Sequence, residues 1–344
     1  MGNEPKNIPV LNGFRGLAVL IVFVSHASNV YFHGNVTGLG GGQLGVMLFF
    51  MLSGFLMAHL YMSRDSSKST QLKFVINRIA RIYPMFAFVV FACFLVNFLD
   101  IPVWVYQIVS FKDVLLNLTF IRGYDVLWTI GPEVIFYGIF LILWKLRRGS
   151  RAVFFMAVVP LTAIAWVPLT VAPTNSLFAL HEKLPYFLVG CMLGMYSDSL
   201  IANDVSTKAW AKTAFGCCAV IFFISMPQVI RLIADVPKRL TGDPWPDPWS
   251  FPFYLVITMG LFITSIIVKP WLLTNRLMSY LGKISFSFYL LHLAILKNIQ
   301  PLLPLYPLRG IILSGFIALG LSSICYVSIE GPARTVIRHF AKRL

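Results

Sequence analysis

The chain has 344 residues, of which 58% are hydrophobic and only 12% are charged, and its mean hydropathy is +0.79. A soluble globular domain carries about 25% charged residues, so this composition excludes a soluble protein and indicates an integral membrane protein. The net charge of +15 would also suit a nucleic-acid-binding protein, but basic cytoplasmic loops produce the same excess in a membrane protein. We therefore expect no nucleic-acid partner.

Long apolar segments recur along the chain, each close to the ~20 residues that a helix needs to cross a bilayer. They are too long for the strands of a membrane barrel, so we predict an all-α polytopic membrane protein with one domain over residues 1–344. The first segment is interpreted as a retained span and not as a signal peptide, because it is long and carries Arg15 and His26. About ten spans are expected, at residues 9–33, 43–62, 82–99, 126–145, 151–171, 181–197, 208–227, 250–269, 281–299 and 308–329.

Basic residues gather in alternate predicted loops. The loops after the second, fourth and eighth spans and the C-terminal tail are rich in Lys and Arg, and the intervening loops are poorer in charge or balanced. Because the positive-inside rule places basic loops in the cytoplasm, we predict that both termini are cytoplasmic. The loop after the second span is predicted to hold Arg64, Lys68, Lys73, Arg78 and Arg81.

Three titratable residues stand out within predicted spans, namely His26 in the first, Glu133 in the fourth and His292 in the ninth. An ionisable group within a membrane is costly and is by default a candidate functional residue. Arg15 and His26 are eleven residues apart, close to three helical turns, so they lie on nearly the same face about 16 Å apart along the axis. One face of the first span thus carries a cation at its cytoplasmic start and an imidazole deep in the membrane.

His26 and Glu133 are expected at similar depths in the membrane. His26 is expected about 21 Å in from the cytoplasmic side, and Glu133 about 10 Å from the external side, so the two side chains could share one level. A carboxylate beside an imidazole fixes its tautomer and stabilises its charged form, as in the base–orienter pairs of acyl-transfer enzymes. A structural hydrogen bond between helices, a proton relay and catalysis all remain open for this pair.

Several other features receive structural interpretations. "GLGGGQLG" at 38–45 lacks a following Lys-Ser/Thr, so we expect a tight external turn and not a phosphate loop. The segment 228–249 is expected to be an irregular interfacial loop. The cysteines, mostly within apolar segments, predict neither a disulfide nor a metal site. Glu330 is expected to pair with nearby basic residues, and no role is assigned to His33, His181 or His339, nor a catalytic one to His59 near the end of the second span.

An ordered set of motifs resembles the integral-membrane acyltransferase type 3 family. "FRGLAVLIVFVSHAS" resembles the Arg-x10-His signature of that family, and the resemblance covers nearly the full chain. Each apolar piece alone is weakly specific, but their order is that of the family. The other pieces are "GVMLFFMLSGFLM" at 45–57, "FVINRIARIYP" at 74–84, "WTIGPEVIFY" at 128–137, "LPYFLVGCMLG" at 184–194, "LGKISFSFYLLHLAIL" at 281–296 and "SIEGPAR" at 328–334.

The resemblance implies an O-acyltransferase that moves an acyl group, usually acetyl, from cytoplasmic acyl-CoA to a carbohydrate hydroxyl. The implied acceptors are lipopolysaccharide O-antigen, exopolysaccharide, peptidoglycan or related, including lipid-linked, glycans. Acetyl-CoA would act as a co-substrate, with no tightly bound cofactor and no metal, in the bacterial inner (cytoplasmic) membrane. Some family members add a soluble extracytoplasmic domain after the last span, and about fifteen residues follow it here, so we expect a stand-alone form, with its oligomeric state left open.

The resemblance also implies roles for single residues. His26 and Glu133 are the catalytic candidates, and Arg15, Arg78 and Arg81 are the candidates for acyl-CoA binding. Guanidinium groups suit the phosphates of CoA. The alternative for Arg78 and Arg81 is that they are simply basic residues on the cytoplasmic side, as the positive-inside rule predicts. The candidates for the substrate path are Ser53, Trp128, Tyr137 and His292, where His292 could instead bond across helices.

One rival from another functional class is a proton-coupled transporter of glycoconjugates or small molecules. Proton relays also use intramembrane His and Glu. Against a transporter, the sequence shows no pair of repeats with matching broken helices. A catalytically inactive scaffold is the third hypothesis, and the complete motif set argues against it.

Overall fold

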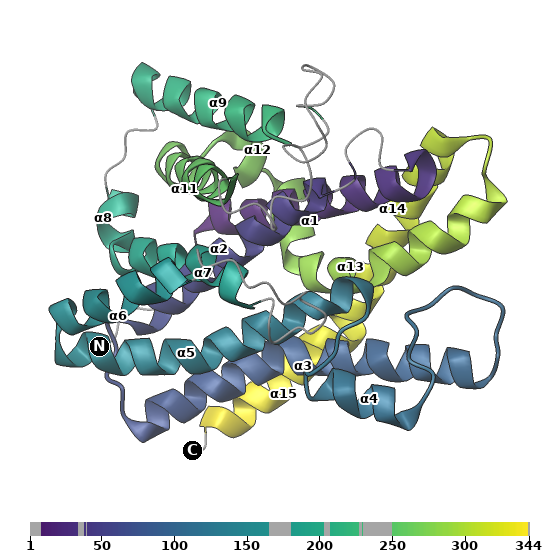
Figure 1. Cartoon of the computed structure of the whole chain (residues 1–344), viewed down its shortest axis with the longest axis horizontal. Coiled ribbons are helices and arrows are strands. Elements are labelled where there is room, and N and C mark those ends of the chain that lie inside the picture. Colours follow the sequence, from purple (N-terminus) through teal and green to yellow (C-terminus); the bar gives the residue numbers. More distant parts are fainter. Residues whose placement is uncertain are drawn as a thin grey trace. The chain divides into compact units, whose positions relative to one another are not determined.

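The computed structural model describes residues 8–33, 38, 40–164, 180–202, 207–226, 229 and 250–342. Helices make up most of this part of the chain, and no strand occurs in it (Figure 1). The prediction of an all-α protein is therefore confirmed. The elements are α1 (Pro9–Phe32), α2 (Gly41–Tyr61), α3 (Lys68–Phe98), α4 (Phe111–Leu118), η1 (Asp125–Thr129), α5 (Ile130–Gly149), α6 (Arg151–Ile164), α7 (Leu180–Met195), α8 (Ser197–Ala202), α9 (Ala209–Ile224), α11 (Ser250–Val268), α12 (Trp271–Thr274), α13 (Arg276–Ile299), η2 (Gln300–Leu302), α14 (Pro307–Cys325), η3 (Tyr326–Glu330) and α15 (Gly331–Lys342).

Six helical stretches of the described residues are long and apolar enough to cross a membrane. They are α1, α2, α3, η1 with α5, α13 with η2, and the run from α14 into α15, and each covers a predicted span. Four further predicted spans fall on the shorter apolar helices α6, α7, α9 and α11. The protein therefore has the character of a membrane-integral protein, while the number of ten spans and the cytoplasmic termini stay predictions.

The chain folds into two compact units that alternate along the sequence. Unit 1 comprises Met1–Arg64, Val158–Pro168 and Glu182–Ser285, and unit 2 comprises Asp65–Ala157, Leu169–His181 and Phe286–Leu344. Because each unit draws on separated stretches, no single boundary divides the sequence into consecutive domains. The prediction of one domain over 1–344 stays a prediction, and the segment 228–249 lies outside the described residues.

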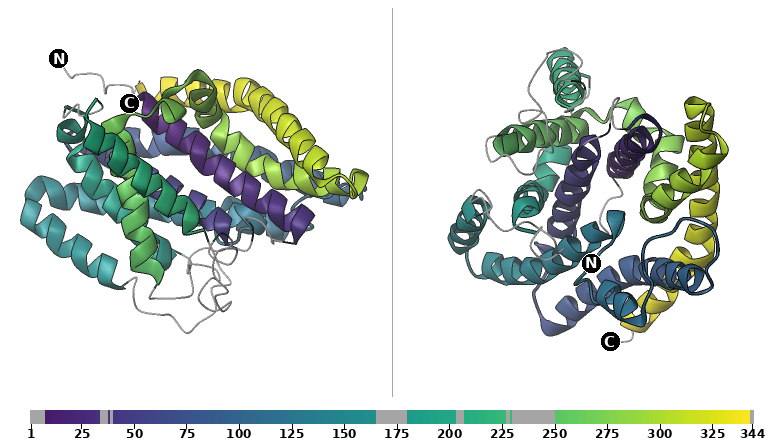
Figure 2. Two further views of the ribbon diagram at one scale, coloured as in Figure 1. Left: turned by 90° about the horizontal axis from the view of Figure 1, so that it is seen from above. Right: turned by 45° about the vertical axis from the view of Figure 1, so that its right-hand side comes forward.

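In unit 1, α1 and α2 lie side by side (Figure 2). Gly40, with φ of 102°, forms the turn that leads into α2, and α2 already begins at Gly41. The expected turn at 38–45 is thus confined to its first residues. The Gly42 N–H donates to Ser25 Oγ of α1 at 2.8 Å, and a Cβ on Gly45 would lie 2.5 Å from the Ala18 carbonyl oxygen. Glycines in this segment therefore serve helix packing as well as the turn.

Helices α2 and α7 also pack closely, at positions occupied by glycine. Gly54 lies against the Phe187 carbonyl and Gly190 against the Met51 carbonyl, so closely that neither position has space for a Cβ. Gly190 and Gly194 are four residues apart on one face of α7, the small-xxx-small pattern of tightly packed membrane helices. The motif pieces at 45–57 and 184–194 therefore form one helix–helix contact.

Helix α3 begins much earlier than predicted. The sequence places 68–81 in a loop because this stretch is rich in Lys and Arg, but α3 runs without interruption from Lys68 to Phe98. Ser67 caps the helix by accepting a hydrogen bond from the Thr70 N–H, and the apolar residues between the charges supply a buried face. Arg78 and Arg81 are therefore helical and not loop residues, which corrects the prediction.

The C-terminal helix continues past the predicted end of the last span. A π-helical turn, η3, joins α14 to α15, and Glu330 ends that turn with 2% of its surface exposed. Ser287 Oγ on α13 donates to Glu330 Oε2 at 3.0 Å, and Arg334, one turn later, forms an ion pair with the same carboxylate. The expected pairing of Glu330 with a nearby basic residue is confirmed.

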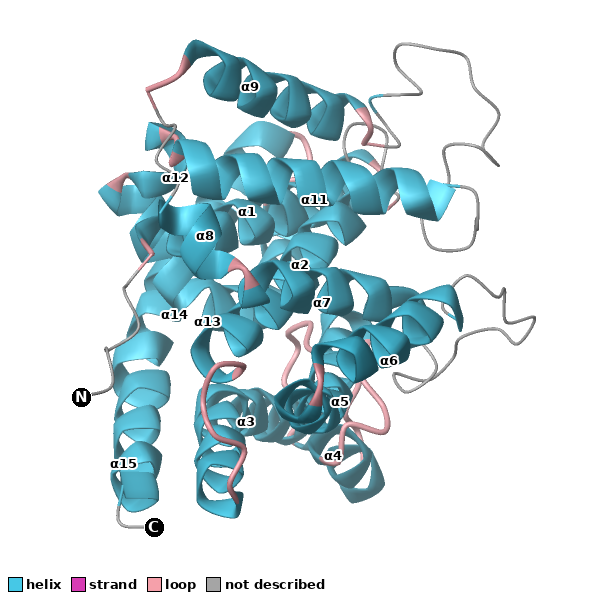
Figure 3. Ribbon diagram, turned by 90° about the vertical axis from the view of Figure 1, so that its left-hand side faces the viewer, coloured by secondary structure: helices cyan, strands magenta, loops and turns pink. Residues whose placement is uncertain are grey.

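The segment between α3 and α4 is held to the helices of unit 2 by amide side chains. Asn97 Nδ2 donates to the carbonyls of Tyr106 and Ile108 at 2.9 and 3.2 Å. Asn298 exchanges two hydrogen bonds with the backbone of Trp104, each of 2.8 Å. The neighbouring loops appear in pink beside α4 in Figure 3. These bonds satisfy backbone groups that no regular element pairs.

Helix α4 starts with a capping box that predicts a pH dependence. Ser110 Oγ donates to Asp113 Oδ2 at 2.7 Å, and the Asp113 N–H donates to Ser110 Oγ at 3.1 Å. The hydrogen bond from Ser110, with further help from Tyr124 and Arg122, lowers the pKa of the Asp113 carboxyl. A lowered folded-state pKa contributes stability that is present above the unfolded pKa of about 3.9 and is lost as the pH falls through the folded value.

The variant Asp113→Asn should therefore be less stable than the wild type at pH 7, by about 1 kcal/mol, near the upper end for an acidic side chain in the first turn of a helix. The difference should shrink as the pH falls below about 4, because the wild-type carboxyl then becomes protonated as well. Thermal unfolding of both proteins in detergent across this pH range measures it. A stability gap that stays constant from pH 7 to pH 3 would contradict the role given to the ionised carboxylate.

Candidate active site

Arg15 and His26 stand on one unbroken helix, α1. Eleven residues at 3.6 per turn place the two side chains on nearly the same face, about 16 Å apart along the axis. Both side chains are half-buried. Arg15 Nη1 donates to Asn12 Oδ1 of the preceding turn at 3.4 Å. The helical relation that the sequence predicts for this pair therefore holds.

The first turns of α1 pack closely on the segment around the start of α13. Gly13 faces the backbone of Leu273, and Gly282 faces the backbone of Asn12, and neither position has space for a Cβ. A Cβ on Gly16 would lie 2.6 Å from the Met278 carbonyl oxygen. The motif that begins at 281 thus packs against the turn that precedes Arg15, which gives its glycine a physical reason.

The other predicted site residue of unit 1 is Ser53. It lies on α2 with 5% of its surface exposed. Its neighbour Gly54 makes the close contact with α7 described above. This position in a tight helix–helix contact accounts for a small side chain, and a role for Ser53 in the substrate path stays a prediction.

Unit 2 brings three predicted site residues together. Tyr137 Oη donates to Glu133 Oε1 at 2.7 Å, one turn earlier on α5. The guanidinium carbon of Arg78 on α3 lies 5.8 Å from the centre of the Tyr137 ring and 5.6 Å from that of Phe74. Distances below about 6 Å are those of cation–π contacts. The ring of Tyr137 therefore links a cation on one helix to the carboxylate on another.

The contacts of Tyr137 with Glu133 and Arg78 were not predicted from the sequence. Tyr137 was predicted only as a residue of the substrate path. The spacing of four residues from Glu133 to Tyr137 puts both on one face of a helix, so this half of the arrangement had a signal in the sequence. The contact with Arg78 joins residues on different helices and has no local signal. Arg81, three residues after Arg78 on α3, and Trp128 in η1 are both half-buried.

His292 is fully buried on α13. Its Nδ1 lies 2.7 Å from the Tyr289 carbonyl oxygen of the same helix, so Nδ1 carries the hydrogen and donates, because a carbonyl only accepts. Tyr289 Oη in turn donates to the Val126 carbonyl at 3.2 Å. This bond lies within one helix and fixes the ring, while a place for His292 in the acceptor path stays a prediction.

His59, which the sequence analysis placed near the end of the second span, makes a polar contact in unit 1. Its Nδ1 lies 2.7 Å from Ser197 Oγ at the start of α8. Its ring also stacks on Phe55 with the centroids 5.9 Å apart. The contact ties the end of α2 to the segment after α7. No role in the reaction is assigned to it.

His26 belongs to unit 1 and Glu133 to unit 2. The predicted pairing of imidazole and carboxylate therefore stays a prediction, as does a joint phosphate site of Arg15 with Arg78 and Arg81. Within the described residues, no three His, Cys, Asp or Glu side chains are grouped as metal ligands.

A family model described as an acyltransferase domain, Acyl_transf_3, matches residues 8–327. The chain belongs to the acyltransferase type 3 family. The match spans both units, from the start of α1 into the π-helical turn η3. The resemblance that the ordered motifs indicate is thereby confirmed. No solved structure matches the chain.

Several curated proteins of Staphylococcus aureus are similar to the chain. The O-acetyltransferase OatA of strain NCTC 8325 / PS 47 is 24% identical over 379 residues, which cover 96% of this chain and 58% of OatA. The protein SACOL0978 of strain COL, provisionally named an O-acetyltransferase, is 23% identical over 332 residues, which cover 86% of this chain and 52% of that protein. The chain thus spans little more than half the length of the curated relatives that it matches.

Proposed function

We propose that the protein is a membrane-bound O-acyltransferase that moves an acetyl group from cytoplasmic acetyl-CoA to a hydroxyl of a cell-surface carbohydrate or glycolipid. O-antigen and exopolysaccharide are examples of such acceptors, and the bacterial inner membrane is the proposed location. The observation that carries this proposal is the placement of Arg15 and His26 on one face of the unbroken helix α1, in a chain that the family model matches over residues 8–327. The relatives named as O-acetyltransferases support the choice of acetyl.

The proposed chemistry is general-base catalysis by His26. The acceptor oxygen attacks the thioester carbonyl of acetyl-CoA while His26 takes the hydroxyl proton. A C–O bond forms, the C–S bond breaks, and the CoA thiolate leaves and is protonated. Such assistance contributes typically 10²–10⁴-fold to the rate, and positioning of the two substrates supplies much of the rest. The proposed role of Glu133 is to orient and stabilise the imidazole.

The donor phosphates are assigned to arginine side chains. Guanidinium groups bind phosphate through paired hydrogen bonds, and Arg15 lies in the second turn of α1, eleven residues before His26. Arg81 is the second half-buried candidate. Arg78 is treated separately below, because its guanidinium contacts two aromatic rings. The pantetheine arm would then carry the thioester from Arg15 toward His26.

Tyr137 is proposed as a positioning residue for Glu133. In Tyr137→Phe the ring and its contact with Arg78 remain, but the carboxylate loses the hydrogen bond from the hydroxyl. We expect kcat to fall about tenfold, since 1.4 kcal/mol is within the range for a hydrogen bond to a charged group, with KM for acetyl-CoA unchanged. Steady-state kinetics of both proteins measure this. An equal loss of thermal stability with kcat intact would assign the hydroxyl a purely structural role.

A transfer assay separates the proposed function from the transporter hypothesis. Purified protein in vesicles is incubated with radiolabelled acetyl-CoA and a panel of glycans, and the label on the glycan and the glycan inside the vesicles are both counted. Label bound to glycan as an alkali-labile ester supports the acyltransferase. Glycan uptake without acylation would overturn it in favour of a transporter.

A further inference from the structure

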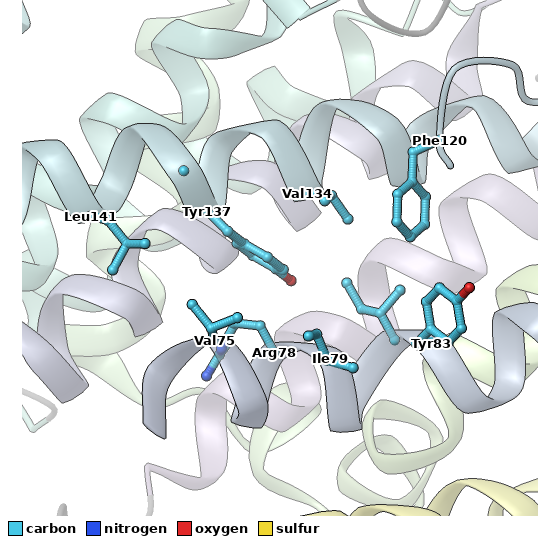
Figure 4. A pocket seen from close by; sticks show the side chains of 10 residues that line it. Val75, Arg78, Ile79, Tyr83, Phe120, Val134, Tyr137 and Leu141 are labelled. Atoms are coloured by element: carbon cyan, nitrogen blue, oxygen red, sulfur yellow. The ribbon is translucent and has the colours of Figure 1, made fainter. Parts of the chain in front are cut away.

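Unit 2 contains a cavity of about 470 Å³ between α3 and α5 (Figure 4). Its walls are almost entirely apolar. Figure 4 shows Val75 and Leu141 toward one end and Tyr83 and Phe120 at the other. The rings of Tyr83 and Phe120 lie edge to face with their centroids 6.2 Å apart. The cavity is therefore an elongated apolar space that runs along two antiparallel helices.

Arg78 is the charged residue in the lining of this cavity. Only 7% of its surface is exposed, and its Nε and one Nη are buried without a hydrogen-bond partner in the described part of the chain. The aromatic rings of Phe74 and Tyr137 contact the guanidinium, but rings do not replace hydrogen-bond acceptors. Because buried N–H groups of a guanidinium without acceptors are costly, the site favours a ligand with an anionic oxygen.

The cavity opens onto an exposed face of α3 and α5. Gly138 lines it and is exposed, and Ile79 and Tyr83 line it with 48% and 39% of their surfaces exposed. All three lie on helices that are long and apolar enough to span a membrane. Exposed apolar side chains on a helix that spans a bilayer face the surrounding lipid. A lipid chain can therefore enter the cavity from the bilayer.

The position of Arg78 along α3 matches the depth of lipid phosphates. From Ile82 to Phe98 the helix carries no charged residue. Arg78 precedes this apolar run by one turn, about 6 Å along the axis. A cation at the boundary of an apolar span lies near the headgroup level, where anionic lipids attract Lys and Arg.

We propose that this cavity binds an anionic phospholipid of the surrounding membrane. The phosphate of the lipid accepts hydrogen bonds from Arg78, and one acyl chain of the lipid lies along the apolar wall formed by α3 and α5. The pantetheine arm of CoA fits the cavity less well, because its amide groups would find few polar partners there. Tyr137 lines the cavity and also bonds to Glu133, but lipid binding at this site requires no acetyl transfer.

Two glycines of α5 provide a matched pair of variants. A Cβ on Gly138 meets no atom within 4 Å, so Gly138→Leu extends into the cavity without a backbone clash. Gly149, the last residue of α5, is equally open and exposed but does not line the cavity. Gly149→Leu is therefore the control for glycine replacement in the same helix. Arg78→Gln removes the cation.

Native mass spectrometry of delipidated protein measures binding of phosphatidylglycerol and of phosphatidylcholine, without acetyl-CoA or glycan. We expect a retained phosphatidylglycerol adduct in the wild type and Gly149→Leu, at least fivefold more abundant than the phosphatidylcholine adduct. Gly138→Leu and Arg78→Gln should reduce it at least fivefold. Equal binding of both lipids, or adducts unaffected by both variants, would overturn the proposal. Because no substrate is present, this result is separate from that of the transfer assay.

A second measurement needs no variant. Phosphatidylglycerol with a photoactivatable group in its acyl chain is crosslinked to the wild type, and the labelled peptides are identified. We expect labelling within 75–83 of α3 or 134–141 of α5 that a tenfold excess of unlabelled phosphatidylglycerol suppresses. Labelling confined to other helices would contradict the site.

Discussion

Replacing His26 with alanine is expected to lower kcat for acetyl transfer by about 10²–10⁴-fold, the usual contribution of a general base. His26 lies well inside the unbroken helix α1, and alanine is well tolerated in the interior of a helix. The side chain is half-buried, so its removal leaves at most a small cavity. The loss should therefore appear in kcat, with the thermal unfolding temperature close to that of the wild type.

The matched control for this variant is His339→Ala on α15, where the imidazole is exposed and no role is assigned. It should retain wild-type kcat. If His26→Ala keeps kcat within about threefold of the wild type, His26 is not the base. If it instead unfolds at a much lower temperature, His26 acts as a structural tie between helices.

Removal of the buried carboxylate Glu330 should cause the largest loss of stability. In Glu330→Ala the guanidinium of Arg334 loses its ion-pair partner, and Ser287 Oγ loses its acceptor. Breaking a buried ion pair on one side costs about 3–5 kcal/mol, because the remaining charge is left uncompensated. The side chain of Glu330 is 3% exposed and that of Arg334 is 25% exposed, so we expect a value near the lower end.

Thermal unfolding in detergent measures this effect against two reference variants. Ser287→Ala removes one hydrogen bond and should cost about 1 kcal/mol. Ser328→Ala should change little, because the exposed Ser328 hydroxyl bonds to the Ile324 carbonyl one turn earlier in the same C-terminal helical run. A stability of Glu330→Ala within 1 kcal/mol of the wild type would show that neither the ion pair with Arg334 nor the hydrogen bond from Ser287 of α13 stabilises the C-terminal helix substantially.

Local relations in the sequence predicted much of this structure. The shared face of Arg15 and His26 follows from the helical period alone, and the pairing of Glu330 with Arg334 spans one turn. The apolar segments located the helices, because a membrane span requires a long uninterrupted run of such residues.

The predicted start of α3 was wrong for a physical reason. The prediction assigned the stretch rich in Lys and Arg to a loop because charged residues are usually exposed. Arg78 is instead buried in a helix, where it faces two aromatic rings. The contact between Arg78 and Tyr137, and the cavity beside it, join helices that are far apart in sequence. A single sequence shows no such tertiary contact, since each helix is apolar on several faces.

The direct test of the proposed function is the recovery of labelled acetyl from the glycan itself. Purified wild type and His26→Ala are given radiolabelled acetyl-CoA and glycan under identical conditions, and alkali-released acetate is counted. We expect ester-linked label with the wild type and at least a hundredfold slower labelling with His26→Ala. Equal labelling by both proteins would contradict the role of His26, and no labelling by either, with uptake of glycan, would contradict the acyltransferase function.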